Sequence, residues 1–454
     1  MRRTQEGSGT PILYEAPSPL ALYHRPIMWG LLVAALLVRA AYLKQLHDSP
    51  LWDSLPEDQL RYRDWGARIA EGNLEGSEPF DRGPLYAYLL GILFRLFGQE
   101  LLIPRLLQIL IGSVTCVLIY RIARHAFSPG AGLAAGVIAA MFGPFLFYDG
   151  MIGPEGLAAF LLAAVIFQLL EADGSQRGLL ATAGLCLGLA WLARDTLILL
   201  AAPVVLWLLL DPWLRSEMTH GRTREGLARA GTFLFGILLV MAPVAARNIH
   251  VSGEVLLLTR AYWEGLYTPD LSLDRLSRQL LAFWSHKELP HSFGHDQHGE
   301  TIEMLQLLAP AFGWIAPLTA AGLALSIPRW RDMLALWLIG GGYVASILLV
   351  VLQGQIRAPA APLLVVFAGY GIVGFARSVS TRRFAWVLVA LIAAGASWLA
   401  SHQDLPIQTP LTASPPAPRS ACAPRPCSCC ASAPRGTTGP PPACAPGPPG
   451  HSPC

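Results

Sequence analysis

Residues 54–88 read SLPEDQLRYRDWGARIAEGNLEGSEPFDRGPLYAY, a polar stretch between segments apolar enough to cross a membrane. The stretch combines acids, arginines and aromatic residues. Four of its residues are spaced at i, i+4, i+7 and i+11: Asp58, Tyr62, Trp65 and Ile69. A helix would carry all four on one face. It is either an amphipathic surface helix with a solvated acid, or one whose Asp58 points back over the protein while Trp65 and Ile69 lie in the lipid interface.

The composition of the whole chain indicates a membrane protein. Of its 454 residues, 53% are hydrophobic and only 14% are charged, whereas a soluble domain has about 25% charged residues. The start, MRR, is not followed by a short apolar region and a cleavage site, so no removable signal peptide is expected. Cys116 and Cys186 lie in apolar segments, where a thiol acts as a small hydrophobic group.

A helix needs about 20 residues to cross about 30 Å of hydrocarbon. The sequence therefore predicts an all-α polytopic membrane protein with about eleven transmembrane helices and two large external loops. The spans lie near Ile27–Leu43, Leu101–Ile122, Gly130–Phe147, Gly156–Leu170, Gly178–Leu192, Leu197–Leu210, Gly231–Ala246, Pro310–Ile327, Met333–Leu352, Ala361–Phe375 and Phe384–Ala400. The apolar segment Pro84–Gly98 is interrupted by Arg95, which indicates an interfacial or re-entrant helix, with a twelfth span as the alternative.

The distribution of arginines predicts the orientation. With residues 1–26 in the cytoplasm, every short cytoplasmic loop is basic, as the positive-inside rule requires. The other side then receives the two large loops, at about 44–100 and 247–308. Acids, aromatics and further arginines collect on that side, whereas a transporter would more often carry ionisable groups near the bilayer midplane. This pattern favours a membrane enzyme that works at the outer interface.

Several motifs resemble one family. They are DQLRYRDWGARIAEG from Asp58, FDRGPLYAYLLGILFRLFG from Phe80, Arg105 with Gln108, Tyr148-Asp149-Gly150 with Glu155, GLCLGLAWLAR ending at Arg194, PVAARNIHVSGEVLLLT from Pro243, and QIRAPAAP around Arg357. Over roughly residues 25–380, their order and spacing resemble the GT-C fold membrane glycosyltransferases of family 39 type. These include the dolichyl-phosphate-mannose protein mannosyltransferases and the lipid A aminoarabinose transferases.

The resemblance implies that residues 27–400 form a catalytic domain at the outer face of the inner membrane. The implied activity is an inverting transfer of a sugar from a polyprenyl-phosphate donor to an acceptor hydroxyl on a protein, lipid or glycan. Such a reaction needs a carboxylate to remove the hydroxyl proton. It also needs cations, or a metal held by acids, to stabilise the departing phosphate. The cofactor is left unknown, with a divalent metal as one alternative, and no nucleic acid is expected as a partner.

The resemblance also suggests site residues. Asp58 corresponds to the proposed base of the first loop, although Glu57 beside it leaves the register open, and Glu155 corresponds to the acid of the second turn. Asp149 either assists them or only ends a helix at the interface. The candidate substrate-binding residues are Tyr62, Asp81, Arg82, Tyr86, Arg194, Arg247 and Arg357.

For each of the last three arginines the alternative to a phosphate ligand is a side chain that reaches the lipid headgroups. Two positions depart from the family pattern. Asp195 stands where the family usually has proline, and it could neutralise Arg194. Gln355 stands where relatives often have an arginine.

Two further segments have an unusual composition. The second loop contains HSFGHDQH from His291, whose spacing fits no standard zinc pattern and indicates surface histidines in a polar loop. Residues 401–454 are rich in Pro, Ala, Ser, Gly and Cys, so they cannot bury enough apolar surface to fold. We predict a disordered tail, with the composition of a frameshifted or truncated reading frame; disulfides or metal binding by its cysteines are the alternatives.

Two other functions remain open from the sequence. One is a transporter or flippase for lipid-linked sugars, which would need polar groups along a path through the bilayer. The other is an inactive membrane scaffold. Hydropathy and charge bias alone support only a polytopic membrane protein with polar external loops.

Overall fold

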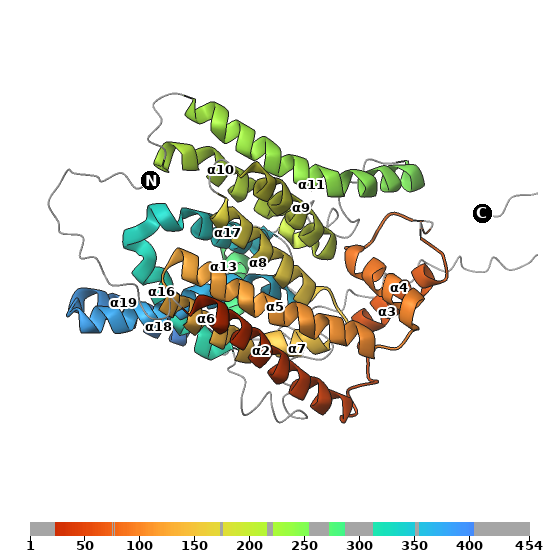
Figure 1. Cartoon of the computed structure of the whole chain (residues 1–454), viewed down its shortest axis with the longest axis horizontal. Helices are drawn as coiled ribbons and strands as arrows, with labels where there is room; N and C mark the ends of the chain where they lie inside the picture. The colour runs from red at the N-terminus through yellow and green to blue at the C-terminus, as the bar shows by residue number, and fades with distance from the viewer. Residues whose placement is uncertain are drawn as a thin grey trace, which may run out of the picture. The chain divides into compact units, whose positions relative to one another are not determined.

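The computed structural model describes residues 23–74, 76, 78–172, 176–215, 221–253, 272–286, 312–349 and 354–403. Within these ranges every regular element is a helix, which confirms the all-α prediction (Figure 1). By its contacts the chain divides into Met1–Pro406 and Ile407–Cys454. The second unit, most of the predicted tail and much of the second loop lie outside the described residues.

Eight of the described helices lie before Arg194. They are α2 (His24–His47), α3 (Glu57–Ala70), α4 (Leu85–Phe97), α5 (Leu102–Ala126), α6 (Pro129–Met141), α7 (Gly143–Gly150), α8 (Glu155–Glu171) and α9 (Arg177–Ala193). After Arg194 the described helices are η1 (Asp195–Leu200), α10 (Ala201–Arg215), α11 (Arg222–Ser252), α13 (Leu273–Trp284), α16 (Phe312–Ser326), η2 (Ile327–Arg329), α17 (Trp330–Leu349), η3 (Gly354–Ala360), α18 (Ala361–Ser380) and α19 (Phe384–Ser401).

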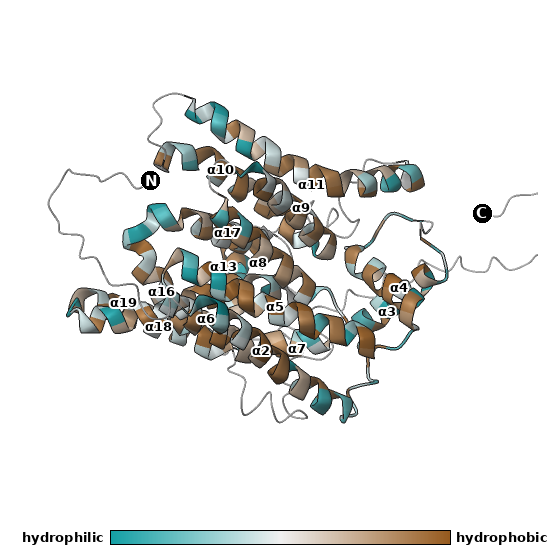
Figure 2. Ribbon diagram, in the orientation of Figure 1, coloured by the Kyte–Doolittle hydropathy of each residue, from teal (hydrophilic) through white to brown (hydrophobic). Residues whose placement is uncertain are grey.

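A helix lies at each of the eleven predicted spans, but fewer of them have the length of a complete span. Among the described residues, seven helices are long and apolar enough to cross a membrane, or eight if a bent pair is one span. The candidate span Arg357–Ser380 is 78% buried in the bundle, whereas Phe384–Ser401 is only 17% buried. Figure 2 shows hydrophobic residues in the middle of α11 and hydrophilic residues at both of its ends. The chain is therefore a multi-pass membrane protein.

Glycines allow the long helices to approach each other closely. A Cβ atom on Gly184 of α9 would lie 1.9 Å from the Phe233 carbonyl oxygen of α11, and one on Gly236 of α11 would lie 2.1 Å from the Ala181 carbonyl oxygen. In lipid, helices associate through such close packing because the hydrophobic effect between them is absent.

The predicted span Gly130–Phe147 is not one straight helix. It consists of α6 and α7, which are bent by 48° at Phe142. Pro144 has no N–H for the Ala140 carbonyl, and its ring disfavours a continuous helix. The pair is either one broken span or a re-entrant loop, and the bend directs α7 toward the turn at Met151–Pro154.

The polar stretch that opens the first loop forms α3, as its spacing predicts. Tyr62 and Ile69 are buried, with 7% and 5% exposure, and a Cβ on Gly91 of α4 would lie 2.4 Å from Ile69 Cγ2. Ile69 therefore packs against α4, and the prediction of a lipid-facing Ile69 was wrong.

Candidate active site

The first candidate base, Asp58, lies in the first turn of α3 and forms an ion pair with Arg82 from the turn before α4. Arg82 Nη1 donates to Asp58 Oδ1 over 2.7 Å, and the two side chains are 32% and 23% exposed. Partial burial opposes the charge on Arg82, but the hydrogen bond and the charge of Asp58 prevail and raise the pKa of this guanidinium. The carboxylate thus has a partner and keeps access to solvent.

Gly83 allows this turn to pack directly against the end of α9. A Cβ there would lie 2.5 Å from the Leu192 carbonyl oxygen and 2.8 Å from that of Ala193. Only a glycine allows the backbone to approach so closely. The contact brings Arg82 to the segment that carries Arg194.

Arg194, directly after α9, forms a buried ion pair with Glu155 at the start of α8. Arg194 Nη2 donates to Glu155 Oε1, and the side chains are 19% and 5% exposed. Removing one partner of a buried pair leaves an uncompensated charge, so such pairs constrain the positions of the elements that carry them. Arg194 thus pairs with a carboxylate on another helix, α8.

Tyr62 lies between these two ion pairs. Burial raises the pKa of its phenol, and the charges of Arg194, Glu155, Asp195 and Arg82 all act on it. The Tyr62 ring also contacts Tyr86 edge to face, at 5.5 Å between centroids. Tyr62 therefore stays neutral close to both pairs.

Two glutamines hold the turn that leads into Glu155. Gln108 of α5 donates to the Met151 carbonyl over 2.6 Å and accepts from the Tyr86 hydroxyl over 3.0 Å. Gln59 of α3 accepts from the Ile152 N–H over 3.0 Å. The role of Gln59 was missed from the sequence, although it follows Asp58 directly.

Asp149, the third candidate catalytic acid, lies in α7 and is 2% exposed. Its Oδ2 accepts from Arg39 Nε of α2 over 2.7 Å. Arg39 was missed from the sequence, although an arginine within an apolar span is a recognised sign of function.

Arg357, the third arginine predicted as a phosphate ligand, lies in η3 and contacts α13 and α16. Its Nη1 donates to the Phe283 carbonyl over 3.2 Å and to the Ser285 carbonyl over 2.5 Å, and its guanidinium lies 4.1 Å from the ring centroid of Phe312. These contacts hold the end of α13, while Ala358 packs in a cluster with α7 residues. The described contacts do not join Arg357 to the two ion pairs.

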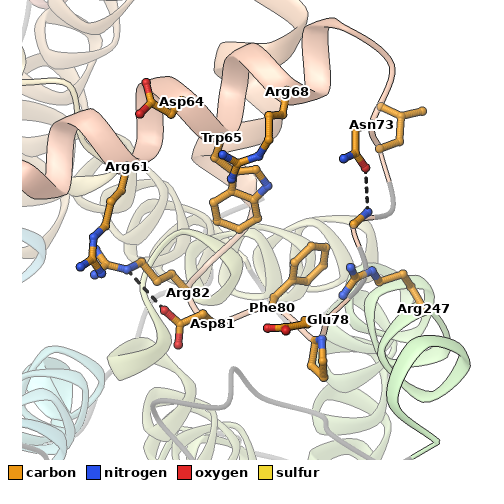
Figure 3. Close-up of a pocket in the computed structure, with 13 residues that line it drawn as sticks. Arg61, Asp64, Trp65, Arg68, Asn73, Glu78, Phe80, Asp81, Arg82 and Arg247 are labelled. Atoms are coloured by element: carbon orange, nitrogen blue, oxygen red, sulfur yellow. Dashed lines mark hydrogen bonds and ion pairs between the residues drawn. The ribbon is translucent and has the colours of Figure 1, made fainter. Parts of the chain in front are cut away.

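A cavity of about 580 Å³, lined by charged, aromatic and other apolar side chains, adjoins Arg82 (Figure 3). It is lined by Arg61, Asp64, Trp65, Arg68, Asn73, Leu74, Gly76, Glu78, Pro79, Phe80, Asp81, Arg82 and Arg247. Arg247, near the end of α11, lies 3.9 Å from the Phe80 ring centroid, and its Nη1 donates to Asn248 Oδ1 over 3.0 Å. The predicted residues Asp81, Arg82 and Arg247 thus share one cavity.

No group of three or more His, Cys, Asp or Glu side chains in the described part of the chain could hold a metal ion. The histidines of HSFGHDQH lie outside that part. The structure therefore assigns no residue to a metal.

Comparisons with known proteins bear on the fold that carries this site. Residues 81–245 match the family model of the dolichyl-phosphate-mannose-protein mannosyltransferases. No curated protein matches the sequence. Among solved structures, the fold is similar to ArnT from Cupriavidus metallidurans bound to undecaprenyl phosphate, with a TM-score of 0.53, 16% identity, and coverage of 76% of this chain and 60% of that one.

A second similar structure is the archaeal oligosaccharyltransferase AglB from Archaeoglobus fulgidus in complex with an inhibitory peptide and a dolichol-phosphate. Its TM-score is 0.51 at 15% identity, with 84% of this chain and 56% of that one covered. The chain thus spans less than two thirds of the length of either structure. Together with the family match, these folds confirm the resemblance stated from the sequence: this chain has the GT-C fold of membrane glycosyltransferases.

Proposed function

We propose that this protein is an inverting glycosyltransferase that moves a sugar from a polyprenyl-phosphate donor to an acceptor hydroxyl at the outer face of the inner membrane. The observation that carries the proposal is that two carboxylate–arginine pairs, Asp58–Arg82 and Glu155–Arg194, lie near Tyr62, and that Arg82 also lines a cavity. The family match and the similar structures, which hold undecaprenyl phosphate or dolichol-phosphate, support the class of donor.

Asp58 is the proposed base, because it is the more exposed of the two carboxylates. It removes the proton from the acceptor hydroxyl while the acceptor oxygen attacks the anomeric carbon. The bond from that carbon to the phosphate oxygen breaks, and its electron pair leaves with the polyprenyl phosphate. A single displacement of this kind inverts the anomeric configuration.

Arg82 and Arg194 are the proposed phosphate ligands, since guanidinium groups suit phosphate oxygens. Glu155 holds Arg194 in place, and Tyr62 supplies a neutral hydroxyl between the two arginines. Arg247 and Asp81 line the cavity, through which the acceptor enters. The Tyr86 ring packs edge to face against the Tyr62 ring, and its hydroxyl donates to Gln108.

The orientation follows from the ends of the helices. Arg177 begins α9 and Arg194 follows its last residue, while Arg121 and Arg124 lie at the end of α5 away from Gln108. The basic ends lie on the cytoplasmic side in the predicted topology. This arrangement supports a site on the external side, within the predicted catalytic domain 27–400.

The test is sugar transfer in membranes from a panel of radiolabelled polyprenyl-phosphate sugars, comparing wild type with Asp58→Asn. We expect a loss of about 10²- to 10⁴-fold, because the base is removed. Glu57→Gln is the matched control: this neighbouring acid is 73% exposed and pairs with Arg61, so transfer should be unchanged.

Three results would count against the proposal. Full transfer by Asp58→Asn would remove Asp58 as the base, and loss in Glu57→Gln alone would move the base by one residue. No transfer with any donor would favour a carrier of lipid-linked sugars or an inactive scaffold.

A further inference from the structure

The buried ion pair between Arg39 and Asp149 has no place in the reaction described above. Arg39 is 0% exposed and Asp149 is 2% exposed; Arg39 lies within the candidate span α2, and Asp149 lies near the end of α7. Charged groups in such a position are costly and are retained where they serve a function.

Arg39 makes contacts on both sides of the bend between α6 and α7. Its Nε donates to Asp149 Oδ2 of α7 over 2.7 Å, and its Nη1 donates to the Ala140 carbonyl of α6 over 3.4 Å. The Ala140 carbonyl would normally accept from the N–H four residues later, which Pro144 does not have. One guanidinium therefore satisfies the carbonyl left by the bend and also fixes the helix that follows it.

Asp149 in turn lies against the start of α8. A Cβ on Gly112 of α5 would lie 2.1 Å from Asp149 Oδ2, and one on Gly156 of α8 would lie 3.1 Å from Asp149 Oδ1. The carboxylate thus occupies the space that these two glycines leave. Gly156 is next to Glu155, and only the turn Met151–Pro154 separates α7 from α8.

We infer that Arg39 is a positioning residue: by fixing Asp149 and the α6–α7 bend, it sets the place of Glu155 and therefore of Arg194 at the site. Asp149 serves this purpose rather than acting as an acid or base. The inference rests on the proposed function for its effect on catalysis, but its structural part can be measured without any substrate.

The test replaces both charges with apolar groups of similar size, Arg39→Met with Asp149→Leu, in the full chain in lipid nanodiscs. Replacing both partners avoids a lone buried charge. The matched control is Arg229→Met with Asp211→Leu, a second Arg–Asp pair, which joins α10 and α11 with 3.0 Å between Nη1 and Oδ2 and with side chains 15% and 12% exposed.

Two readouts separate a positioning role from a general structural one. Hydrogen exchange of the Met151–Gly153 amides should become about tenfold faster in the Arg39/Asp149 variant, because the turn loses its anchor. With a transferable donor, kcat should fall about a hundredfold, while the KM for donor changes by less than about threefold. The control variant should match wild type in both measurements.

The outcomes are distinct. Faster exchange without transfer by wild type would uphold the positioning role and reject the proposed function. Unchanged exchange in a folded Arg39/Asp149 variant, or an equal change in the control, would overturn the inference. If the double variant does not fold, Arg39→Lys serves instead: one ammonium cannot serve both acceptors in the same geometry, so exchange should still rise, and unchanged exchange would again overturn the inference.

Discussion

The candidate site and the middle of the bundle are held together by different means. At the site, ion pairs and glutamine hydrogen bonds join α3, the turn before α4, α8 and α9 near Tyr62. In the middle, glycines bring helices together, as Gly184 and Gly236 do between α9 and α11. The polar contacts constrain the orientation of the side chains at the site, whereas the glycines set the distance between two helices. The stability of the site should therefore be sensitive to changes of charge, and that of the α9–α11 contact to changes of side-chain volume.

The largest expected change in stability is at the ion pair between Glu155 and Arg194. Glu155→Gln leaves Arg194 without its charged partner, so we expect a loss of about 3–5 kcal/mol in the free energy of unfolding, together with loss of sugar transfer. Thermal unfolding in detergent measures the first and the radiolabelled assay the second. Glu171→Gln, at the other end of α8, is the control: its pair with Arg121 is 3.6 Å long and 38% exposed, so the change should be below about 1 kcal/mol. Equal losses of stability in Glu155→Gln and Glu171→Gln would show that the more buried ion pair contributes no more than the exposed one.

The next effect concerns volume in the middle of the bundle. Gly184→Ala places a methyl group against the α11 backbone, which should destabilise the protein by about 1–3 kcal/mol. Gly178→Ala on the same helix has nothing within 4 Å of the new Cβ and should be neutral or slightly stabilising. Thermal unfolding of the two variants compares them directly, and similar midpoints would show that close approach does not stabilise α9 against α11.

The smallest effect is expected for a single hydroxyl. Tyr86→Phe removes the donor to Gln108 and should reduce stability by about 0.5–1.5 kcal/mol, with a modest fall in kcat because Gln108 still holds Met151. Thermal unfolding and transfer kinetics measure the two effects. A loss as large as that of Asp58→Asn would instead place Tyr86 in direct contact with substrate.

The sequence predicted the helix and the motifs that form this site, but it did not predict which side chains form ion pairs with each other. The i, i+4, i+7, i+11 spacing correctly predicted α3, and motif order correctly indicated the GT-C fold. The partners of Asp149 and Glu155 could not be predicted, because Arg39 lies 110 residues from Asp149 and Arg194 lies 39 from Glu155. Charge alone favoured the adjacent Asp195 for Arg194. Pro144 could have indicated the bend, but its apolar surroundings favoured one continuous span.

Arg82 belongs both to the ion pair with Asp58 and to the wall of the cavity. Under the proposed function, one guanidinium cannot hold the carboxylate and a donor phosphate with equal strength. Donor binding would therefore draw Arg82 away and release Asp58 as a base only once a sugar is present. In kinetic terms this describes ordered addition, donor before acceptor. It also keeps water in the open cavity from being activated while the enzyme waits, which limits wasteful hydrolysis of the lipid-linked sugar.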